Sequence, residues 1–158
     1  MKTRIVAALV CAVSTSGSWN PTPKAEAGEN AKTTAGKSVK VPADKVQFLH
    51  SGIVQHGGEI MIGPAFGDFK AGRHGTFLHF QGKWASLLHS HTSDYYGVTI
   101  KGVMANPSKG EADVPLPPGS YWYQKGGQPH TTKCISDEEC LIFIVSDNKF
   151  DAQVLEKE

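Results

Sequence analysis

The sequence predicts an all-β fold of the sandwich or barrel type, and three observations lead to this prediction. The 158 residues include 17 glycines and 9 prolines, which punctuate short strands and turns better than long helices. From residue 46 onward, short apolar runs are separated by turn signals about every 8 to 12 residues. No convincing helix of about twelve residues or more is indicated. Residues 46–158 are enough for a single jelly roll of about eight strands.

The first 27 residues are typical of a secretory signal peptide. Lys2 and Arg4 precede an apolar run over residues 5–13, and the Ala-Glu-Ala at residues 25–27 fits the small-x-small cleavage pattern. The apolar run is too short to span a bilayer, and a buried N-terminal helix is disfavoured because the run has no amphipathic period. We therefore expect a secreted or periplasmic protein with no membrane attachment after cleavage. Residues 28–45 are predicted to be a polar leader, and residues 46–158 the folded domain.

The strands can be assigned from the apolar runs in chain order. They are expected over residues 46–50, 58–63, 76–80, 95–104, 119–124, 130–134 and 140–145. Gly63 and Pro64 indicate a turn after the second of these, and the last two form a predicted hairpin with its loop at residues 135–139. The 16 basic and 15 acidic residues nearly cancel, so no charge pattern points to a nucleic-acid partner.

Three histidines are spaced so that they can share a metal ion. His89 and His91 stand at positions i and i+2, which point to the same face of a strand. His130 follows about forty residues later, behind a glycine turn. Neutral imidazole suits Fe, Zn, Mn, Ni or Cu, so we expect one divalent transition metal per chain, whose identity the sequence does not select. The remaining histidines have no partner at ligand spacing and are expected to be structural or exposed: His50, His56, His74 and His79.

These two segments resemble the two motifs of the cupin superfamily. The first motif has paired histidines followed by a glutamate and a closing glycine, matched here by His89, His91 and Gly102. The second has a glycine, a second glycine and a histidine, matched by Gly119, Gly127 and His130. The departures are Gly82, one residue too far from His89, Tyr95 at the glutamate position, Lys125 at the proline position and Cys134 at the asparagine position. The resemblance covers residues 70–150, and the segments at residues 91–98 and 117–122 further resemble an uncharacterised ChrR-like cupin family.

The resemblance implies a single cupin jelly-roll β-barrel with one metal held by His89, His91 and His130. Because the usual carboxylate is absent, Tyr95 would act either as a phenolate ligand or as a hydrogen-bond donor to substrate or bound oxygen. Three protein ligands leave coordination positions open. A metal-dependent dioxygenase acting on a small molecule is the first expectation, with a hydrolase or isomerase behind it. The alternatives are a non-catalytic module that binds or senses a small molecule or metal, and a purely structural domain.

Strand alternation leaves open which tyrosine faces the metal. If Tyr95 points inward, Lys101 follows it on the same face, whereas if Tyr96 points inward, Val98 and Ile100 follow. The motif register favours Tyr95. Asp94 is a weaker candidate, because a turn aspartate commonly bonds its own backbone.

The cysteines and aromatic residues carry further expectations. Cys11 would leave with the signal peptide, and the remaining Cys134 and Cys140 would form a disulfide, with a Cys134 thiolate ligand as the alternative. Exposed strand edges and the habit of the cupin family favour a homodimer. An aromatic set can either line a pocket or pack the barrel: Trp84, Tyr121, Trp122 and Tyr123.

Overall fold

The computed structural model describes residues 37–155, which form strands and one short 3-10 turn, η2 (Ala43–Lys45). The strands are β1 (Leu49–Gln55), β2 (Gly58–Gly67), β3 (His74–Phe80), β4 (His89–Ser90), β5 (Tyr95–Lys101), β6 (Met104–Ala105), β7 (Tyr121–Gln124), β8 (Lys133–Cys134), β9 (Cys140–Ser146) and β10 (Gln153–Val154). The predicted signal peptide, Cys11 and most of the predicted leader lie outside the described residues. Within residues 37–155, no helix is long and apolar enough to cross a membrane.

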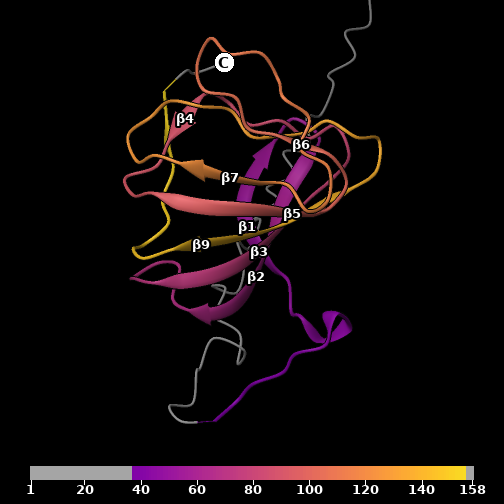
Figure 1. The fold of residues 1–158 in the computed structure, drawn as a ribbon, viewed down its shortest axis with the longest axis vertical. Helices are drawn as coiled ribbons and strands as arrows, with labels where there is room; N and C mark the ends of the chain where they lie inside the picture. The colour runs from indigo at the N-terminus through magenta and orange to yellow at the C-terminus, as the bar shows by residue number, and fades with distance from the viewer. Residues whose placement is uncertain (1–36, 156–158) are drawn as a thin grey trace, which may run out of the picture.

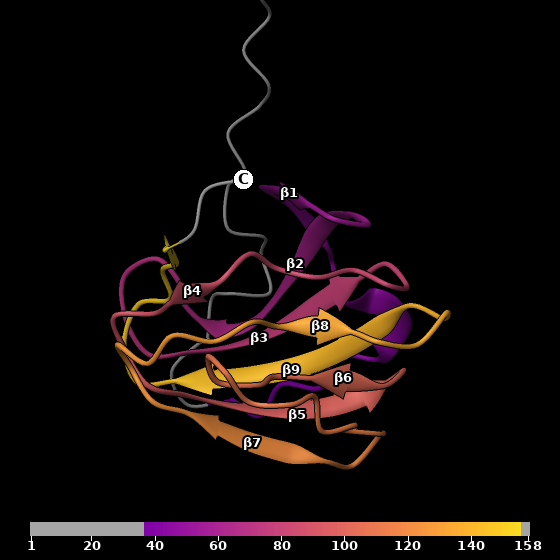
Figure 2. The same cartoon turned by 90° about the horizontal axis from the view of Figure 1, so that it is seen from above.

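The strands form one large antiparallel sheet and two small ladders. The large sheet has the order β1-β2-β3-β9-β5-β7, and the ladders pair β10 with β4 and β6 with β8 (Figure 1). Isolated bridges, including Ala85 to Lys133 and His89 to His130, join the ladders into a looser second layer. Figure 2 shows β4, β6 and β8 running alongside the strands of the large sheet. The predicted jelly-roll barrel is thereby confirmed.

Alternation along the strands builds the barrel interior. On β9, Cys140, Ile142, Ile144 and Ser146 are buried, while the residues between them are only partly buried. The inward side chains of neighbouring strands meet in one core, because directly paired residues point to the same face. The core cluster contains Leu78, Phe80, Trp84, Tyr95, Met104, Cys134, Cys140, Ile142 and Ile144.

One expected turn and one expected strand pairing are wrong. Gly63 and Pro64 do not end β2, which continues to Gly67 through a register shift between Pro64 and Phe66. A proline is tolerated at such a bulge, where ladder hydrogen bonds are already interrupted. The predicted hairpin over residues 130–145 also does not form, because β8 pairs with β6 whereas β9 pairs with β3 and β5.

The expected strand over residues 95–104 is divided at Gly102. This residue has a φ of +72°, and a Cβ there would lie 2.6 Å from the Sγ atom of Cys140. Only glycine combines this backbone conformation with so close an approach. The chain therefore leaves the large sheet after Lys101 and enters the second layer as β6.

The cysteines join the two layers. Cys134 at the end of β8 and Cys140 at the start of β9 form a disulfide with a Cα–Cα distance of 5.8 Å. The expected disulfide is confirmed, and the alternative of a Cys134 thiolate as a metal ligand is wrong, since this sulfur is already bonded.

Candidate metal centre

The structure brings the three predicted histidines together inside the barrel. One ligand atom from each of His89, His91 and His130 lies within 4.8 Å of the others, and all three residues are buried. His89 lies in β4, and its backbone exchanges hydrogen bonds of 3.0 and 2.9 Å with the backbone of His130. The amide of Gly127, which has a φ of +74°, donates to the His91 carbonyl over 2.7 Å. The glycine turn thus fixes the approach of His130.

All three imidazoles are oriented by their Nδ1 atoms. His89 Nδ1 donates to the Leu87 carbonyl over 2.9 Å, and His130 Nδ1 donates to the Gln128 carbonyl over 3.0 Å. His91 Nδ1 donates to the Asp151 carbonyl. A carbonyl can only accept, so each neutral ring carries its proton on Nδ1 and leaves Nε2 with a free lone pair. Metal-binding histidines are commonly held in this way by partners outside the metal's own ligands.

One nitrogen atom of the cluster lacks a hydrogen-bond partner, and this bears on whether a metal fits there. His130 Nε2 is fully buried and has no hydrogen-bond partner among the described residues. Such a buried acceptor costs free energy unless something binds it. Three imidazole nitrogens within 4.8 Å of one another, one of them fully buried and without a partner, fit a transition metal with nitrogen ligands.

Burial also keeps these rings neutral. Desolvation lowers the pKa of His91 to about 4, with the charge of His89 adding to the effect and the hydrogen bond to Asp151 opposing it. Desolvation, followed by the charge of His89, lowers the pKa of His130 to about 4. The pKa of His89 is lowered as well, again through desolvation. A metal ligand must be unprotonated, so the cluster is ready for a metal at neutral pH without losing protons.

Tyr95 and not Tyr96 faces the histidines. Tyr95 is 3% exposed, and its ring centroid lies 5.1 Å from that of His91. Burial raises the pKa of Tyr95 to about 12, a shift that the polar side chains of Trp122, Thr132 and Asn106 partly oppose. Tyr95 is therefore a neutral phenol in the metal-free protein, able to donate a hydrogen bond.

By simple alternation Lys101 would follow Tyr95 on the inward face, but in the structure it does not point inward. A register shift between Thr99 and Lys101 releases Lys101 to the surface, where its Nζ lies 2.6 Å from a Glu139 carboxylate oxygen. Tyr96 is 57% exposed and packs against Tyr123.

Asp94 connects the two halves of the motif. One of its carboxylate oxygens accepts the Gly126 amide over 2.7 Å, and the other accepts the Tyr123 hydroxyl over 2.7 Å. The Gly126 bond, with that of Tyr123 second, lowers the pKa of Asp94. Asp94 is thus a surface positioning residue that bonds to the turn before His130.

The sequence patterns did not indicate the C-terminal segment that completes this centre. Phe150 stacks on His91 with ring centroids 4.4 Å apart, and β10 pairs with β4. Asp151 holds both the His91 ring, through its carbonyl, and the Thr92 amide, through its carboxylate at 2.8 Å. These contacts depend on a fold-back of the chain by some sixty residues, which no local motif encodes.

The other candidate residues do not belong to the three-histidine cluster. His50 pairs with Glu59 at 2.9 Å and His79 with Glu139 at 3.0 Å, both near the surface, and His56 is exposed. Tyr121 and Tyr123 are exposed and Trp122 is partly buried, while Trp84 packs in the core and also lines a small cavity beside the histidines. This cavity of about 70 Å³ lies beside His89, His91 and Tyr95, lined otherwise mainly by apolar side chains.

One known protein family matches the central part of the chain. The model described as "Domain of unknown function (DUF4437)" matches residues 62–144, slightly more than half of the chain. The chain belongs to the DUF4437 family. The matched range of this DUF4437 protein includes all three histidines and Tyr95 but ends before Phe150 and Asp151. No curated protein matches its sequence.

Solved structures similar to the DUF4437 protein include a protein of the cupin superfamily. The polyketide cyclase RemF from Streptomyces resistomycificus has a TM-score of 0.62 at 13% identity, covering 77% of this chain and 88% of its own. A sugar phosphate isomerase of the cupin superfamily from Silicibacter pomeroyi has a TM-score of 0.58 at 13% identity, and the match covers 75% of this chain and 83% of the isomerase. A predicted oxalate decarboxylase from Thermotoga maritima has a TM-score of 0.58 at 16% identity, and the match covers 70% of this chain and 99% of the other chain. At these identities the similarity establishes the cupin fold alone.

Proposed function

We propose that this protein holds one divalent transition metal at His89, His91 and His130 and acts as a metal-dependent enzyme on a small molecule. The observation that carries the proposal is the convergence of three buried, neutral imidazoles whose Nδ1 atoms are all engaged by backbone carbonyls. Dioxygenase chemistry is the first candidate, ahead of hydrolysis and isomerisation. Three protein ligands leave open positions, and bound Fe(II) would supply substrate chelation and oxygen activation there.

The chain's own residues would position and protect the substrate. The neutral phenol of Tyr95, buried beside His91, is placed to donate a hydrogen bond to a substrate oxygen. Apolar side chains such as Leu78, Ile142 and Ile144 line the same cavity and exclude water. The names of the similar structures, a cyclase, an isomerase and a predicted decarboxylase, support catalysis only as an analogy between folds.

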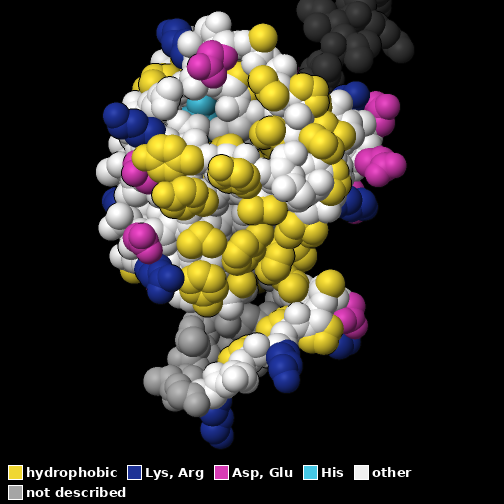
Figure 3. Space-filling view, in the orientation of Figure 1, with side chains coloured by type: hydrophobic (Ala, Val, Ile, Leu, Met, Phe, Trp, Pro, Cys, Tyr) yellow, Lys and Arg dark blue, Asp and Glu magenta, His cyan; other side chains and the backbone are white. Residues whose placement is uncertain are grey.

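We further propose that the protein is exported and dimeric. The Cys134–Cys140 disulfide supports an oxidising compartment, as does the resemblance of residues 1–27 to a signal peptide. The ChrR-like relationship is part of the same proposal. Exposed apolar side chains on β5 and β7, visible as a broad apolar face in Figure 3, support a homodimer. They are Tyr96, Val98, Ile100, Tyr121 and Tyr123.

The second candidate function is a non-catalytic module that binds a metal or small molecule. The cavity of only about 70 Å³ beside the histidines favours this alternative, because it is small for a substrate together with an oxidant. Saturable binding of a small molecule without turnover by the metal-loaded protein would support this alternative over the enzyme.

Elemental analysis of aerobically and anaerobically purified protein tests the proposal. We expect about one transition metal per chain, lost in His89→Ala and His130→Ala and kept in His79→Ala, whose side chain pairs with Glu139 away from the cluster. With metal present, oxygen uptake is measured against a panel of oxygenated small molecules. Tyr95→Phe should keep the metal and slow uptake by about tenfold or more. Negligible metal that Fe(II), Zn or Mn does not restore would contradict the proposal.

A further inference from the structure

His74 is a second buried histidine inside the barrel, separate from the three-histidine centre. It starts the inward row of β3, which continues through Thr76, Leu78 and Phe80. Its exposure is 0%, and its Nε2 atom has no hydrogen-bond partner among residues 37–155. The sequence suggested only a structural or exposed residue here. An unpaired polar atom at such depth requires a physical explanation.

The neighbouring threonine decides where the His74 proton sits. His74 Nδ1 lies 2.9 Å from Thr76 Oγ1, and both side chains are buried. If Nδ1 donated, both the threonine hydroxyl proton and the Nε2 lone pair would lack partners. If the hydroxyl donates to Nδ1, only the Nε2–H group lacks one. The second arrangement satisfies more buried groups, so Nε2 carries the proton.

The ring is a neutral donor. Desolvation lowers the pKa of His74, and the negative charge of Asp68 only partly opposes this effect. An unpaired neutral N–H group in an apolar wall matches an uncharged oxygen acceptor. A carboxylate is a poorer match, because its charge would have to be desolvated against this apolar wall.

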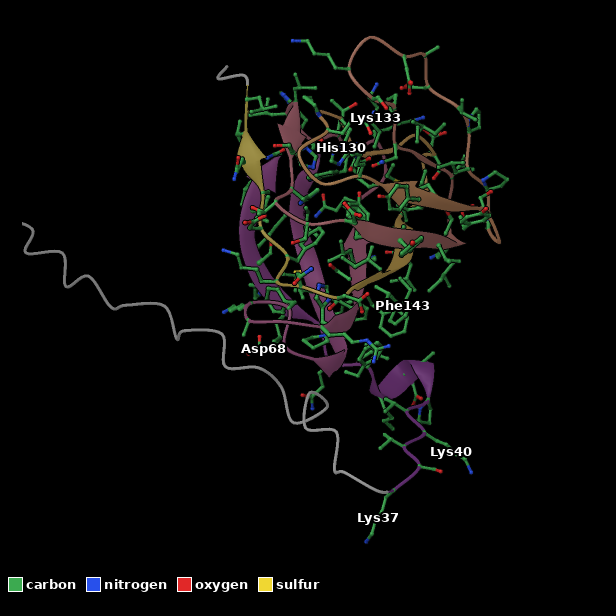
Figure 4. The ribbon with its side chains drawn as sticks, turned by 60° about the vertical axis from the view of Figure 1, so that its left-hand side comes forward. Lys37, Lys40, Asp68, His130, Lys133 and Phe143 are labelled. Carbon is green, nitrogen blue, oxygen red and sulfur yellow. A yellow bond between two sulfur atoms is a disulfide. The ribbon has the colours of Figure 1, made fainter. Side chains whose placement is uncertain are left out.

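A cavity of about 870 Å³ reaches His74 from the surface. Its walls are mostly apolar, and Asp68, Lys70 and Glu59 contribute polar groups. It shares wall residues with the small cavity beside the three histidines: Ile53, Ile60, Leu78, Ile144, Phe150 and Ala152. Figure 4 shows Asp68 at the end of the domain remote from His130. The larger cavity therefore extends from this remote end to the walls of the metal centre.

Two phenylalanine rings control the contact with His74. Phe69 and Phe150 meet the His74 ring edge-on, with centroids 6.4 and 6.0 Å away. The Phe150 amide donates to the Phe69 carbonyl over 2.7 Å, so this hydrogen bond holds the two phenylalanine residues next to each other. Phe150 also stacks on His91 and hence separates the two compartments. Since His74 has no exposed surface, a ligand would reach Nε2 only after one of these rings had turned aside.

We propose that His74 is a ligand-binding residue that donates a hydrogen bond from Nε2 to an uncharged carbonyl oxygen of a mostly apolar small molecule. The opposite end of that molecule lies against the wall that the two cavities share beside the three-histidine centre, and this part alone rests on the proposed function. The substrate class is thus an apolar ketone, aldehyde or ester rather than a carboxylate.

Metal-free full-length protein and a matched probe pair test the inference. 1-Indanone and indane have the same bicyclic body and differ in one carbonyl oxygen. We expect the wild type to bind 1-indanone about three- to tenfold more tightly than indane, the effect of one neutral hydrogen bond. His74→Leu should reduce the ratio to near one, while His79→Leu, on the same strand with its side chain paired to Glu139, should keep it. In the wild type, 1-indanone should also shift the nitrogen-15 resonance of His74 Nε2.

Several outcomes overturn the inference. These are a wild-type ratio near one, an unchanged ratio in His74→Leu, or an unmoved His74 resonance at saturating 1-indanone. If His74→Leu fails to fold, the wild-type resonance decides. Because the binding test uses metal-free protein, the two proposals can fail separately. A protein that prefers 1-indanone to indane but binds no metal in the elemental analysis would contradict the proposed function alone. A protein that binds metal but does not prefer 1-indanone would contradict this inference alone.

Discussion

His91 and His130 are neutral because they are buried, and this makes the stability of the metal-free protein depend on pH. Their pKa values are about 4 in the folded chain, against about 6.5 in an unfolded chain. Between these values the unfolded state binds more protons, so the free energy of unfolding falls as pH decreases from about 6.5 to about 4. Near pH 5 the loss is on the order of 2 kcal/mol per histidine. Urea unfolding of metal-free protein at neutral and acidic pH measures it.

A variant identifies the residue responsible for this pH dependence. His91→Gln removes one of the two histidines whose pKa lies near 4, so its unfolding free energy should fall less on acidification than that of the wild type. An equally steep pH dependence in His91→Gln would show that burial of this ring is not the cause.

At the residue scale, the sequence predicted the groups that belong to a motif and missed those that depend on tertiary contacts. His89, His91 and His130 could be selected because their spacing and the glycine turn are local. Tyr95 followed from motif register, although simple alternation could not decide it. Asp151 was missed because its carbonyl reaches His91 from a segment sixty residues away. His74 was missed because a lone histidine in a strand gives no sign of an unpaired nitrogen.

At the scale of elements, the C-terminal segment that ends in β10 holds the His91 ring in place. Truncation after Asn148 removes Phe150, Asp151 and β10, and with them the acceptor of His91 Nδ1 and the ring stacked on His91. We expect metal affinity to fall by about 10- to 100-fold, the usual effect of losing such a support. Competition with a chromophoric chelator measures the affinity.

Two matched variants show whether this loss is specific. Deletion of residues 156–158 leaves β10 in place and should keep the affinity of the full chain. Asp151→Ala loses the carboxylate bonds to Thr92, at 2.8 and 2.5 Å, and the ion pair with Lys149, but keeps the carbonyl that accepts from His91, so it should have an intermediate affinity. If the chain truncated after Asn148 folds and binds metal as tightly as the full chain, β10 has no part in holding His91.

The element boundaries show which strands are encoded locally. The range of β9 was predicted to within one residue, because Cys140–Ser146 is an apolar run bounded by a polar loop. Pro64 was taken for a turn because the bulge that accommodates it is created by pairing with β3. The pairing of β8 with β6 was missed because adjacent strands in a chain usually form a hairpin, and here the chain changes layers instead.

At the scale of the whole molecule, the site and the core belong to the same structure. The inward row of the large sheet supplies Tyr95 and the apolar walls, whereas the three histidines come from β4 and from the loops beside it and β8. A metal bound at this junction would bind only the folded chain and would stabilise the barrel as a whole. The Cys134–Cys140 disulfide joins the same two layers at a place away from the histidines.

This second connection can be tested without disturbing the first. Replacing both cysteines with alanine opens a loop with a sequence separation of 6, which should lower the free energy of unfolding by about 2 kcal/mol through the gain in unfolded-chain entropy. Both sulfurs are buried outside the histidine cluster, so metal content should stay unchanged. Urea unfolding and elemental analysis measure the two effects. On unfolding with reductant, the native chain should gain the mass of two hydrogen atoms. A native chain with free thiols, or a double variant as stable as the wild type, would show that the disulfide does not help to hold the layers together.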